Sequence, residues 1–206
     1  MARKTKEDAE QTRLAILDSA LQTFYEKGFA RTTFDEIAKR INLTKGAVYW
    51  HFRNKTDLIA ALILQKLSDQ RRINSEDKVD TLTDLRQIII KRSKNIEQNA
   101  EFRRFLFFMI YRMEWSEAVF AKVWPEISEL CELPEKELYN VLERLQQNGE
   151  IKADTDIGQL KELLICLWKG VIGKYIIADN QLKESLSSMV GSLFDMVINS
   201  VKVEKK

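Results

Sequence analysis

The chain has 206 residues, of which 45% are hydrophobic, so it is long enough for one medium domain or for two small ones. It contains only seven glycines and two prolines, and this scarcity of turn residues argues against a β-rich fold and for long helices. No apolar run approaches the length of a membrane span and the charged N-terminus is unlike a secretory signal, so we expect a cytoplasmic protein with no membrane partner.

The distribution of charge and of metal-binding residues narrows the function further. The net charge of +2 hides a basic segment, because residues 1–72 contain 14 of the 33 basic residues but 9 of the 31 acidic ones. This asymmetry favours an anionic partner, although a solvated basic face would give the same pattern. One histidine and two cysteines, Cys131 and Cys166, are too few for a zinc site. We therefore expect no metal and no cofactor, and interpret both cysteines as small buried residues rather than a redox pair.

Three helices are predicted at the start of the chain. The first runs from the candidate N-cap Thr5 to Gly28, because apolar residues recur at helical spacing and glycine suits a left-handed C-cap. Residues 33–36, Thr-Phe-Asp-Glu, form a capping box that starts the second helix. A tight turn at residues 42–43 leads to Thr44, the N-cap of the third. Two short helices joined by a tight turn make a helix-turn-helix, so the sequence predicts a DNA-binding unit.

The third helix, residues 45–51, has the features of a DNA-recognition helix. Its capped N-terminus attracts phosphate, and Gly46 allows a backbone to come close. Aromatic residues with hydroxyl or N–H groups beside cations can hydrogen-bond phosphates, stack on sugars and contact thymine methyl groups. The sequence leaves open that Tyr49 and Trp50 belong to the core and that His51 is a solvated surface residue. The candidates for DNA contact on these grounds are Thr44, Lys45, Gly46, Tyr49, Trp50, His51 and Lys55.

The run TTFDEIAKRINLTKGAVYWHFRNKTDL, residues 32–58, resembles the DNA-binding domain of the tetracycline-repressor (TetR) family. Residues 5–65 look most like its AcrR branch, which represses multidrug efflux pumps, and beyond them only the architecture is similar. The resemblance implies base-edge contacts for residues 45–47, which adds Ala47 to the candidates, and phosphate or base contacts for Tyr49, Trp50 and His51. It also implies a contact at Thr33 and a phosphate contact at Lys55.

The apolar spacing remains helical beyond a polar linker at residues 73–80. Pro125 and Pro134, each followed by Glu, are interpreted as first-turn prolines of new helices. Residues 101–115 are apolar on nearly every side, which predicts a helix buried by other helices. Further helices are expected at about residues 56–72, 81–98, 156–178 and 182–202.

These patterns predict an all-α fold of about nine helices. Residues 1–55 form a three-helix, helix-turn-helix DNA-binding domain, and residues 56–206 form a helical domain for ligand binding and dimerisation. Aromatic and methionine side chains are dense at residues 101–124, so although any one of them is better explained as ordinary core, the density suggests that some line a pocket for a lipophilic molecule. The candidate ligand-binding residues are Phe105, Phe108, Met109, Met113, Glu114 and Trp168.

Glycines inside the last two predicted helices indicate close helix packing. Gly170, Gly173 and Gly191 stand where glycine costs roughly 1 kcal/mol relative to alanine, and the close approach of another helix would explain that cost. The TetR resemblance implies a four-helix dimer interface, so we predict a homodimer through residues 156–202. Packing within one subunit is the alternative.

We therefore predict a TetR-type transcriptional repressor that binds palindromic double-stranded operator DNA and leaves it when a small lipophilic inducer binds. Control of an efflux or stress operon follows from the AcrR resemblance. The alternatives are a TetR-type regulator without a small-molecule effector, or an activator. The sequence contains no catalytic triad pattern, phosphate loop or metal cluster, so an enzyme is not expected.

Overall fold

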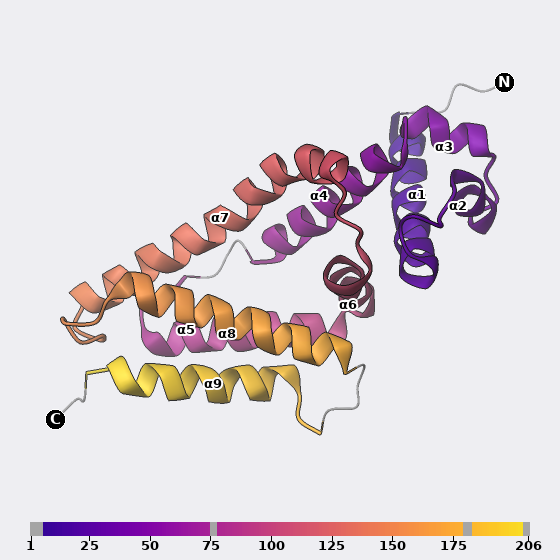
Figure 1. The fold of residues 1–206 in the computed structure, drawn as a ribbon. Helices are drawn as coiled ribbons and strands as arrows, with labels where there is room; N and C mark the ends of the chain where they lie inside the picture. The colour runs from indigo at the N-terminus through magenta and orange to yellow at the C-terminus, as the bar shows by residue number, and fades with distance from the viewer. Residues whose placement is uncertain (1–5, 75–77, 179–182, 204–206) are drawn as a thin grey trace. The chain divides into compact units, whose positions relative to one another are not determined.

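The computed structural model describes residues 6–74, 78–178 and 183–203, and its regular structure there is helical. The only β pairing among these residues is an isolated bridge between Ile151 and Lys202. The predicted all-α class is confirmed (Figure 1). In the same ranges, no helix combines the length and apolar character that crossing a bilayer requires. The elements in chain order are α1 (Lys6–Lys27), α2 (Phe34–Arg40), α3 (Lys45–His51), α4 (Lys55–Asn74), α5 (Leu82–Gln98), α6 (Ala100–Phe107), the π-helical segment η1 (Phe108–Arg112), α7 (Glu117–Gln147), α8 (Ile157–Ile177) and α9 (Leu186–Val201).

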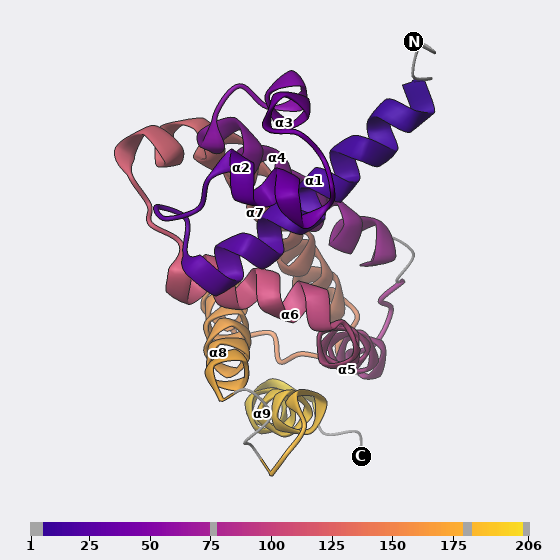
Figure 2. The ribbon, with the colours of Figure 1, turned by 90° about the vertical axis from the view of Figure 1, so that its right-hand side faces the viewer.

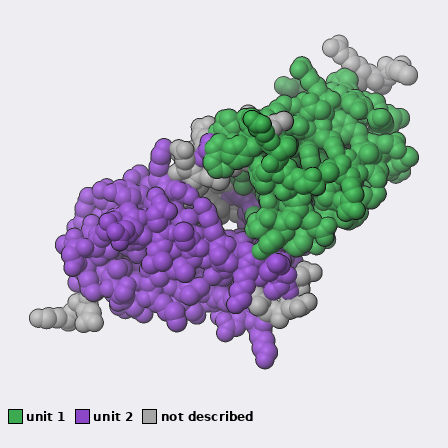
Figure 3. All heavy atoms as spheres, viewed as in Figure 1, with its two compact units in different colours: residues 1–69, 104–127 green, residues 70–103, 128–206 purple. Residues whose placement is uncertain are grey.

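Packing divides the chain into two compact units, each built from two separate stretches of sequence (Figure 3). Unit 1 comprises Met1–Asp69 and Arg104–Ile127, and unit 2 comprises Gln70–Arg103 and Ser128–Lys206. Most of α4 and the segment around η1 therefore pack with the helix-turn-helix. The expected division into a DNA-binding domain, residues 1–55, and a ligand-binding and dimerisation domain, residues 56–206, stays a prediction.

Unit 1 is organised around α1. The side chains of Leu17, Leu21 and Phe24 are at most 1% exposed, as the apolar spacing predicted, whereas Leu14 of the same predicted face is 38% exposed. The hydroxyl of buried Ser19 donates to the carbonyl of Ile37 at 2.9 Å and joins α1 to α2. Gly28, with φ +81°, ends α1 in the left-handed conformation expected of a glycine C-cap.

Unit 2 is a helical bundle in which α9 packs against α5 and α8 (Figure 2). The guanidinium of Arg86 on α5 donates to both carboxylate oxygens of Asp195 on α9, at 2.7 and 2.8 Å. This hydrogen-bonded ion pair lowers the pKa of Asp195. A Cβ at Gly191 would lie 3.4 Å from the side chain of Ile90, so this glycine permits contact between α9 and α5 of the same chain. The alternative of packing within one subunit therefore accounts for Gly191.

The interpretation of the two prolines is wrong. Helix α7 runs from Glu117 to Gln147 without a break, so Pro125 and Pro134 lie inside one helix instead of starting two. A proline inside a helix lacks one N–H donor and crowds the carbonyl four residues earlier, but it does not have to end the helix. After the end of α7, Gly149 adopts φ +75°, a left-handed conformation that glycine accepts without strain.

The helix predicted at residues 101–115 is interrupted. Helix α6 ends at Phe107 and continues as the π-helical turn η1, after which Met113 has an extended backbone. Ile110, Tyr111 and Trp115 are 48%, 42% and 42% exposed, so the expectation of burial on every side is wrong. The wider turn shifts the helical phase, which keeps Phe108 inside and turns the residues after it outward.

The expectation of buried cysteines is also wrong where the structure tests it. Cys166 on α8 is exposed and carries a free thiol. The side chain of Cys131 lies outside the described residues. A single exposed cysteine on a helix surface does not contribute to either core.

Candidate nucleic-acid interface

Helix α3 is held in place by its cap and by one buried face. The hydroxyl oxygen of Thr44 accepts a hydrogen bond from the backbone N–H of Ala47 at 3.2 Å, as predicted for the N-cap. Val48 is fully buried, and Phe52, directly after the helix, is 4% exposed. Asn42 adopts φ +53° in the turn before the helix, which is a conformation that asparagine tolerates. The local sequence therefore fixes both the start and the orientation of α3.

The opposite face of α3 is open to solvent. Trp50 is 74% exposed and Tyr49 is 51% exposed, which excludes a core role for either side chain. Lys45 and Gly46 are also exposed, whereas Ala47 and His51 are half-buried. A Cβ at Gly46 would meet only the hydroxyl of Thr44, at 3.8 Å, so packing within this chain does not require glycine there. The open position suits the close approach of an external group.

Thr33 begins α2 with the predicted capping box. Its hydroxyl oxygen accepts from the backbone N–H of Glu36 at 3.3 Å, and the carboxylate of Glu36 accepts from the backbone N–H of Thr33 at 2.9 Å. Glu36 also accepts a 2.6 Å hydrogen bond from the ammonium of Lys27 on α1. The pKa of Glu36 is lowered from the ordinary 4.5 to about 2. The hydrogen bond from Lys27 makes the largest contribution, and the hydrogen bonds from Thr33 add to it.

This pKa predicts how acid affects the helix-turn-helix. Because the folded-state pKa of Glu36 is lowered, the ionised carboxylate stabilises the folded state above the ordinary pKa of 4.5, and this contribution is lost as the pH falls toward 2. Glu36→Gln should therefore lower the melting temperature at pH 7, and the gap to the wild-type should close in acid. Circular dichroism melts at several pH values measure both. Glu137→Gln, at an exposed position of α7, is the matched control and should leave the melting temperature unchanged at every pH. A gap that stays constant down to pH 2 would contradict the role of ionised Glu36.

Lys55 makes contacts that the sequence did not indicate. Its ammonium donates to the backbone carbonyls of Phe29 and Ala30 at 2.9 and 2.8 Å and lies 5.0 Å from the centre of the Phe29 ring. These contacts tie the first turn of α4 to the connection between α1 and α2. An ammonium has three N–H donors, so one remains for a phosphate. Phosphate binding by Lys55 stays a prediction.

The candidate ligand residues are distributed over both units, and their role in ligand binding stays a prediction. Phe105 and Phe108 are 1% and 0% exposed in the core of unit 1, where the Phe108 ring stacks on Phe24 of α1 with 5.5 Å between ring centres. Met109 and Met113 are half-buried and Glu114 is exposed in the same unit. Trp168, also half-buried, belongs to α8 of unit 2.

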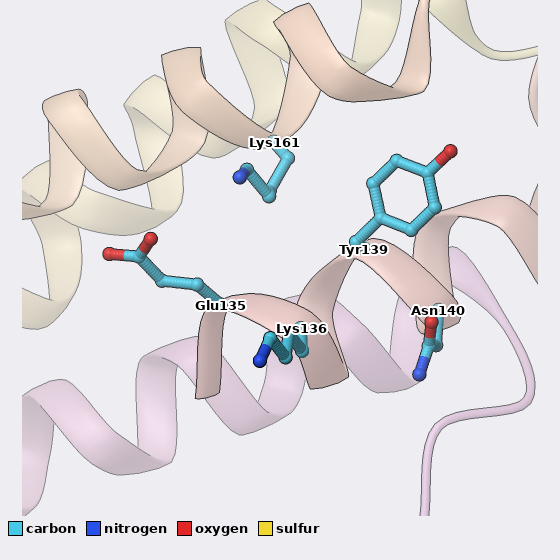
Figure 4. Close-up of a pocket in the computed structure, with 5 residues that line it drawn as sticks. All are labelled: Glu135, Lys136, Tyr139, Asn140 and Lys161. Atoms are coloured by element: carbon cyan, nitrogen blue, oxygen red, sulfur yellow. The ribbon is translucent and has the colours of Figure 1, made fainter. Parts of the chain in front are cut away.

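A surface pocket of about 250 Å³ in unit 2 includes none of the candidate ligand residues (Figure 4). Four of its lining residues come from α7 and one lysine comes from α8. The lining residues are Glu135, Lys136, Tyr139, Asn140 and Lys161.

Two aromatic residues important to this surface were not singled out by the sequence. Phe34, the first residue of α2, is 5% exposed and its ring meets that of Tyr49 at a centre-to-centre distance of 4.9 Å. Phe29 supplies both a carbonyl and a ring to Lys55. The available signal was the position of Phe34 directly after the capping threonine.

Comparison with known proteins agrees with this geometry. The family model described as bacterial regulatory proteins, tetR family, matches residues 16–62, which span most of α1, α2, α3 and the start of α4. The probable HTH-type transcriptional regulator ArpR of Pseudomonas putida is 28% identical over 191 residues, which are 86% of this chain and 86% of ArpR. The HTH-type transcriptional regulator AcrR of Shigella flexneri is 42% identical over 94 residues, 44% of each chain.

A solved structure extends the similarity over nearly the whole chain. The complex of SmeT with triclosan superimposes with a TM-score of 0.75 at 26% identity and covers 94% of this chain and 93% of SmeT. SmeT is described as the repressor of the Stenotrophomonas maltophilia multidrug efflux pump SmeDEF. These relatives are named as regulators and not as enzymes, and they share the helix-turn-helix whose geometry is described above. Residues 16–62 therefore form a DNA-binding domain of the type described for the tetR family of bacterial regulatory proteins, and the chain as a whole is similar to transcriptional regulators such as ArpR and SmeT.

Proposed function

We propose that this protein is a homodimeric repressor that binds a palindromic operator with α3 of each protomer and leaves it when a small lipophilic ligand binds. The observation that carries the proposal is the exposed face of α3, where Lys45, Tyr49 and Trp50 project from a capped helix whose other face is fixed by Val48. The similarity to AcrR and SmeT supports an efflux operon as the target.

The exposed apolar side chains of unit 2 support dimerisation. On α8, Leu163 and Ile177 are 47% and 58% exposed, and on α9, Met196 is 70% exposed. A Cβ at Gly170 of α8 would meet no atom within 4 Å, so its own chain does not explain this glycine. Leu163, Gly170 and Ile177 recur every seven residues, which is the spacing of a helix face that packs against another helix.

Light scattering should give twice the chain mass of 24.1 kDa at micromolar concentration. Replacing both Leu163 and Ile177 by Glu should shift the mass toward one chain, because it places charges on the apolar face. Leu14→Glu, at a leucine of α1 that is 38% exposed, is the matched control and should remain a dimer. A wild-type monomer, or a dimer that both substitutions leave intact, would contradict the interface.

The packing around η1 supports a link between ligand and DNA. Met109 directly follows Phe108, whose ring stacks on Phe24 of α1, and Met113 directly follows the end of η1. One residue before Phe108, the centre of the Phe107 ring lies 5.3 Å from that of Tyr25 on α1. A molecule that displaces residues 105–113 would therefore change packing on α1 itself, and an effect on DNA affinity requires such a difference between two states.

The function can be tested with DNA selected by the protein itself. The wild-type should enrich a palindrome from a randomised duplex pool, and triclosan, the ligand bound to SmeT, should lower its affinity for that palindrome. Tryptophan quenching by triclosan and by lipophilic dyes reports binding, and gel shifts report release. If compounds bind but none changes operator affinity, the outcome supports the alternative of a regulator without a small-molecule effector. If no sequence is enriched, the DNA-binding function itself fails.

A further inference from the structure

Lys45 is held by a neighbour on its own helix. It lies in the first turn of α3, and its ammonium is 5.6 Å from the centre of the Tyr49 ring, one helical turn later. A cation over an aromatic face is attracted by the ring's electron distribution. This contact restricts a long side chain that would otherwise sample many rotamers at the helix surface.

The ring of Tyr49 is in turn positioned by its contact with Phe34 of α2. Half of the Tyr49 surface is exposed, yet the edge of its ring meets Phe34 at a centre-to-centre distance of 4.9 Å and an interplanar angle of 61°. Phe34 is buried, and its backbone follows the capping box of Thr33 and Glu36. A series of contacts therefore connects the start of α2 with Lys45: the Phe34 ring contacts the Tyr49 ring, which in turn contacts the Lys45 ammonium.

We propose that Tyr49 is a positioning residue that aims the Lys45 ammonium at a base edge and thereby sets the base preference of α3. The inference rests on the proposed function, and it adds a role for the tyrosine ring to the contacts expected of its hydroxyl. Lysine recognises guanine by donating to O6 and N7, and a pre-oriented lysine discriminates better because less rotamer freedom is lost on binding.

Two substitutions distinguish the contribution of the Tyr49 ring from that of its hydroxyl. Tyr49→Phe keeps the ring over Lys45 and removes the hydroxyl, whereas Tyr49→Leu keeps an apolar side chain and removes the ring. Tyr139→Leu, at a tyrosine of α7 that is 39% exposed, controls for the loss of an exposed ring elsewhere. Circular dichroism establishes that each variant is folded.

The first readout needs no DNA. In protein with 13C-labelled lysine, the ε-methylene signal of Lys45 should be shifted upfield by the Tyr49 ring, and Lys45→Ala identifies it. The shift should survive Tyr49→Phe and Tyr139→Leu and disappear in Tyr49→Leu. A signal at the ordinary lysine position in the wild-type would overturn the contact without affecting the proposed DNA-binding function.

The second readout is base preference on the palindrome that the wild-type selects from a randomised duplex pool. Tyr49→Leu should reduce discrimination at the same base pair as Lys45→Ala by about two- to five-fold, the strength of an exposed cation–π contact, and Tyr49→Phe should retain that discrimination. In the double variant, Tyr49→Leu should add nothing at that base pair. If Tyr49→Leu weakens all sequences equally and adds to Lys45→Ala, Tyr49 contacts only the DNA backbone and the positioning role is wrong.

Discussion

Lys45→Ala should weaken operator binding by about 1–3 kcal/mol and flatten the preference at one base pair in each half-site. The side chain is exposed in the first turn of α3, where recognition helices reach base edges. Its ring contact with Tyr49 is at the surface, so the melting temperature should stay close to that of the wild-type. Fluorescence anisotropy on the selected palindrome and on its single-base variants measures the affinity and the preference.

Lys55→Ala provides the contrast because it separates backbone contact from base recognition. If the third N–H of Lys55 binds phosphate, the variant should bind all sequences more weakly and the salt slope should fall by about 1. The hydrogen bonds from Lys55 to the carbonyls of Phe29 and Ala30 predict a lower melting temperature as well. A lower melting temperature with an unchanged salt slope would assign Lys55 to the fold alone. Unchanged affinity in folded Lys45→Ala and Lys55→Ala would mean that α3 does not read DNA.

The helix-turn-helix could be predicted closely because local chemistry sets its boundaries. The caps at Thr33 and Thr44 each supply a hydrogen-bond acceptor to a backbone N–H three residues later. Gly28 ends α1 because it can adopt a positive φ. Such signals are visible in the sequence without knowledge of the packing. The exposed face of α3 followed from the burial of Val48, which helical spacing also indicates.

The region from α6 to α7 could not be predicted in the same way. The π-helical turn at Phe108–Arg112 changes the phase of the helix, and no residue type specifies such a turn. Whether a helix ends at Pro125 or continues through it depends on tertiary packing, which the sequence pattern does not contain. Aromatic density alone also does not separate the buried Phe108 from the exposed Trp115, so the ligand-binding residues stay a prediction.

The hydrogen bonds of Lys55 to Phe29 and Ala30 also could not be predicted from the sequence. Lys55 stands at the start of the helix that follows the recognition helix, but the carbonyls that accept from its ammonium lie about 25 residues earlier in the chain. A contact of this kind depends on how the turn after α1 meets the first turn of α4. Residue type and spacing therefore identify which groups can bind an anion, whereas the fold decides which of their hydrogen bonds are already used.

Phe108→Ala should have the largest effect on stability, about 3–5 kcal/mol, because it removes a fully buried ring from the core of unit 1. Urea unfolding followed by circular dichroism measures the loss. Phe120→Ala, at a phenylalanine of α7 in the same unit that is 44% exposed, is the matched control and should cost far less. Equal losses at the two positions would contradict the assignment of Phe108 to the core.

Phe108→Leu tests whether the same residue links ligand to DNA. Leucine retains much of the buried volume but removes the ring that stacks on Phe24 at 5.5 Å, so the variant should stay folded. If ligand binding acts on α1 through this stack, Phe108→Leu should bind the operator as the wild-type does and should require more triclosan for release. Its triclosan affinity, measured by tryptophan quenching without DNA, must be unchanged for this conclusion. Equal release of wild-type and variant at equal ligand occupancy would show that coupling follows another route, because a stack that transmits the change cannot be removed without altering the coupling free energy.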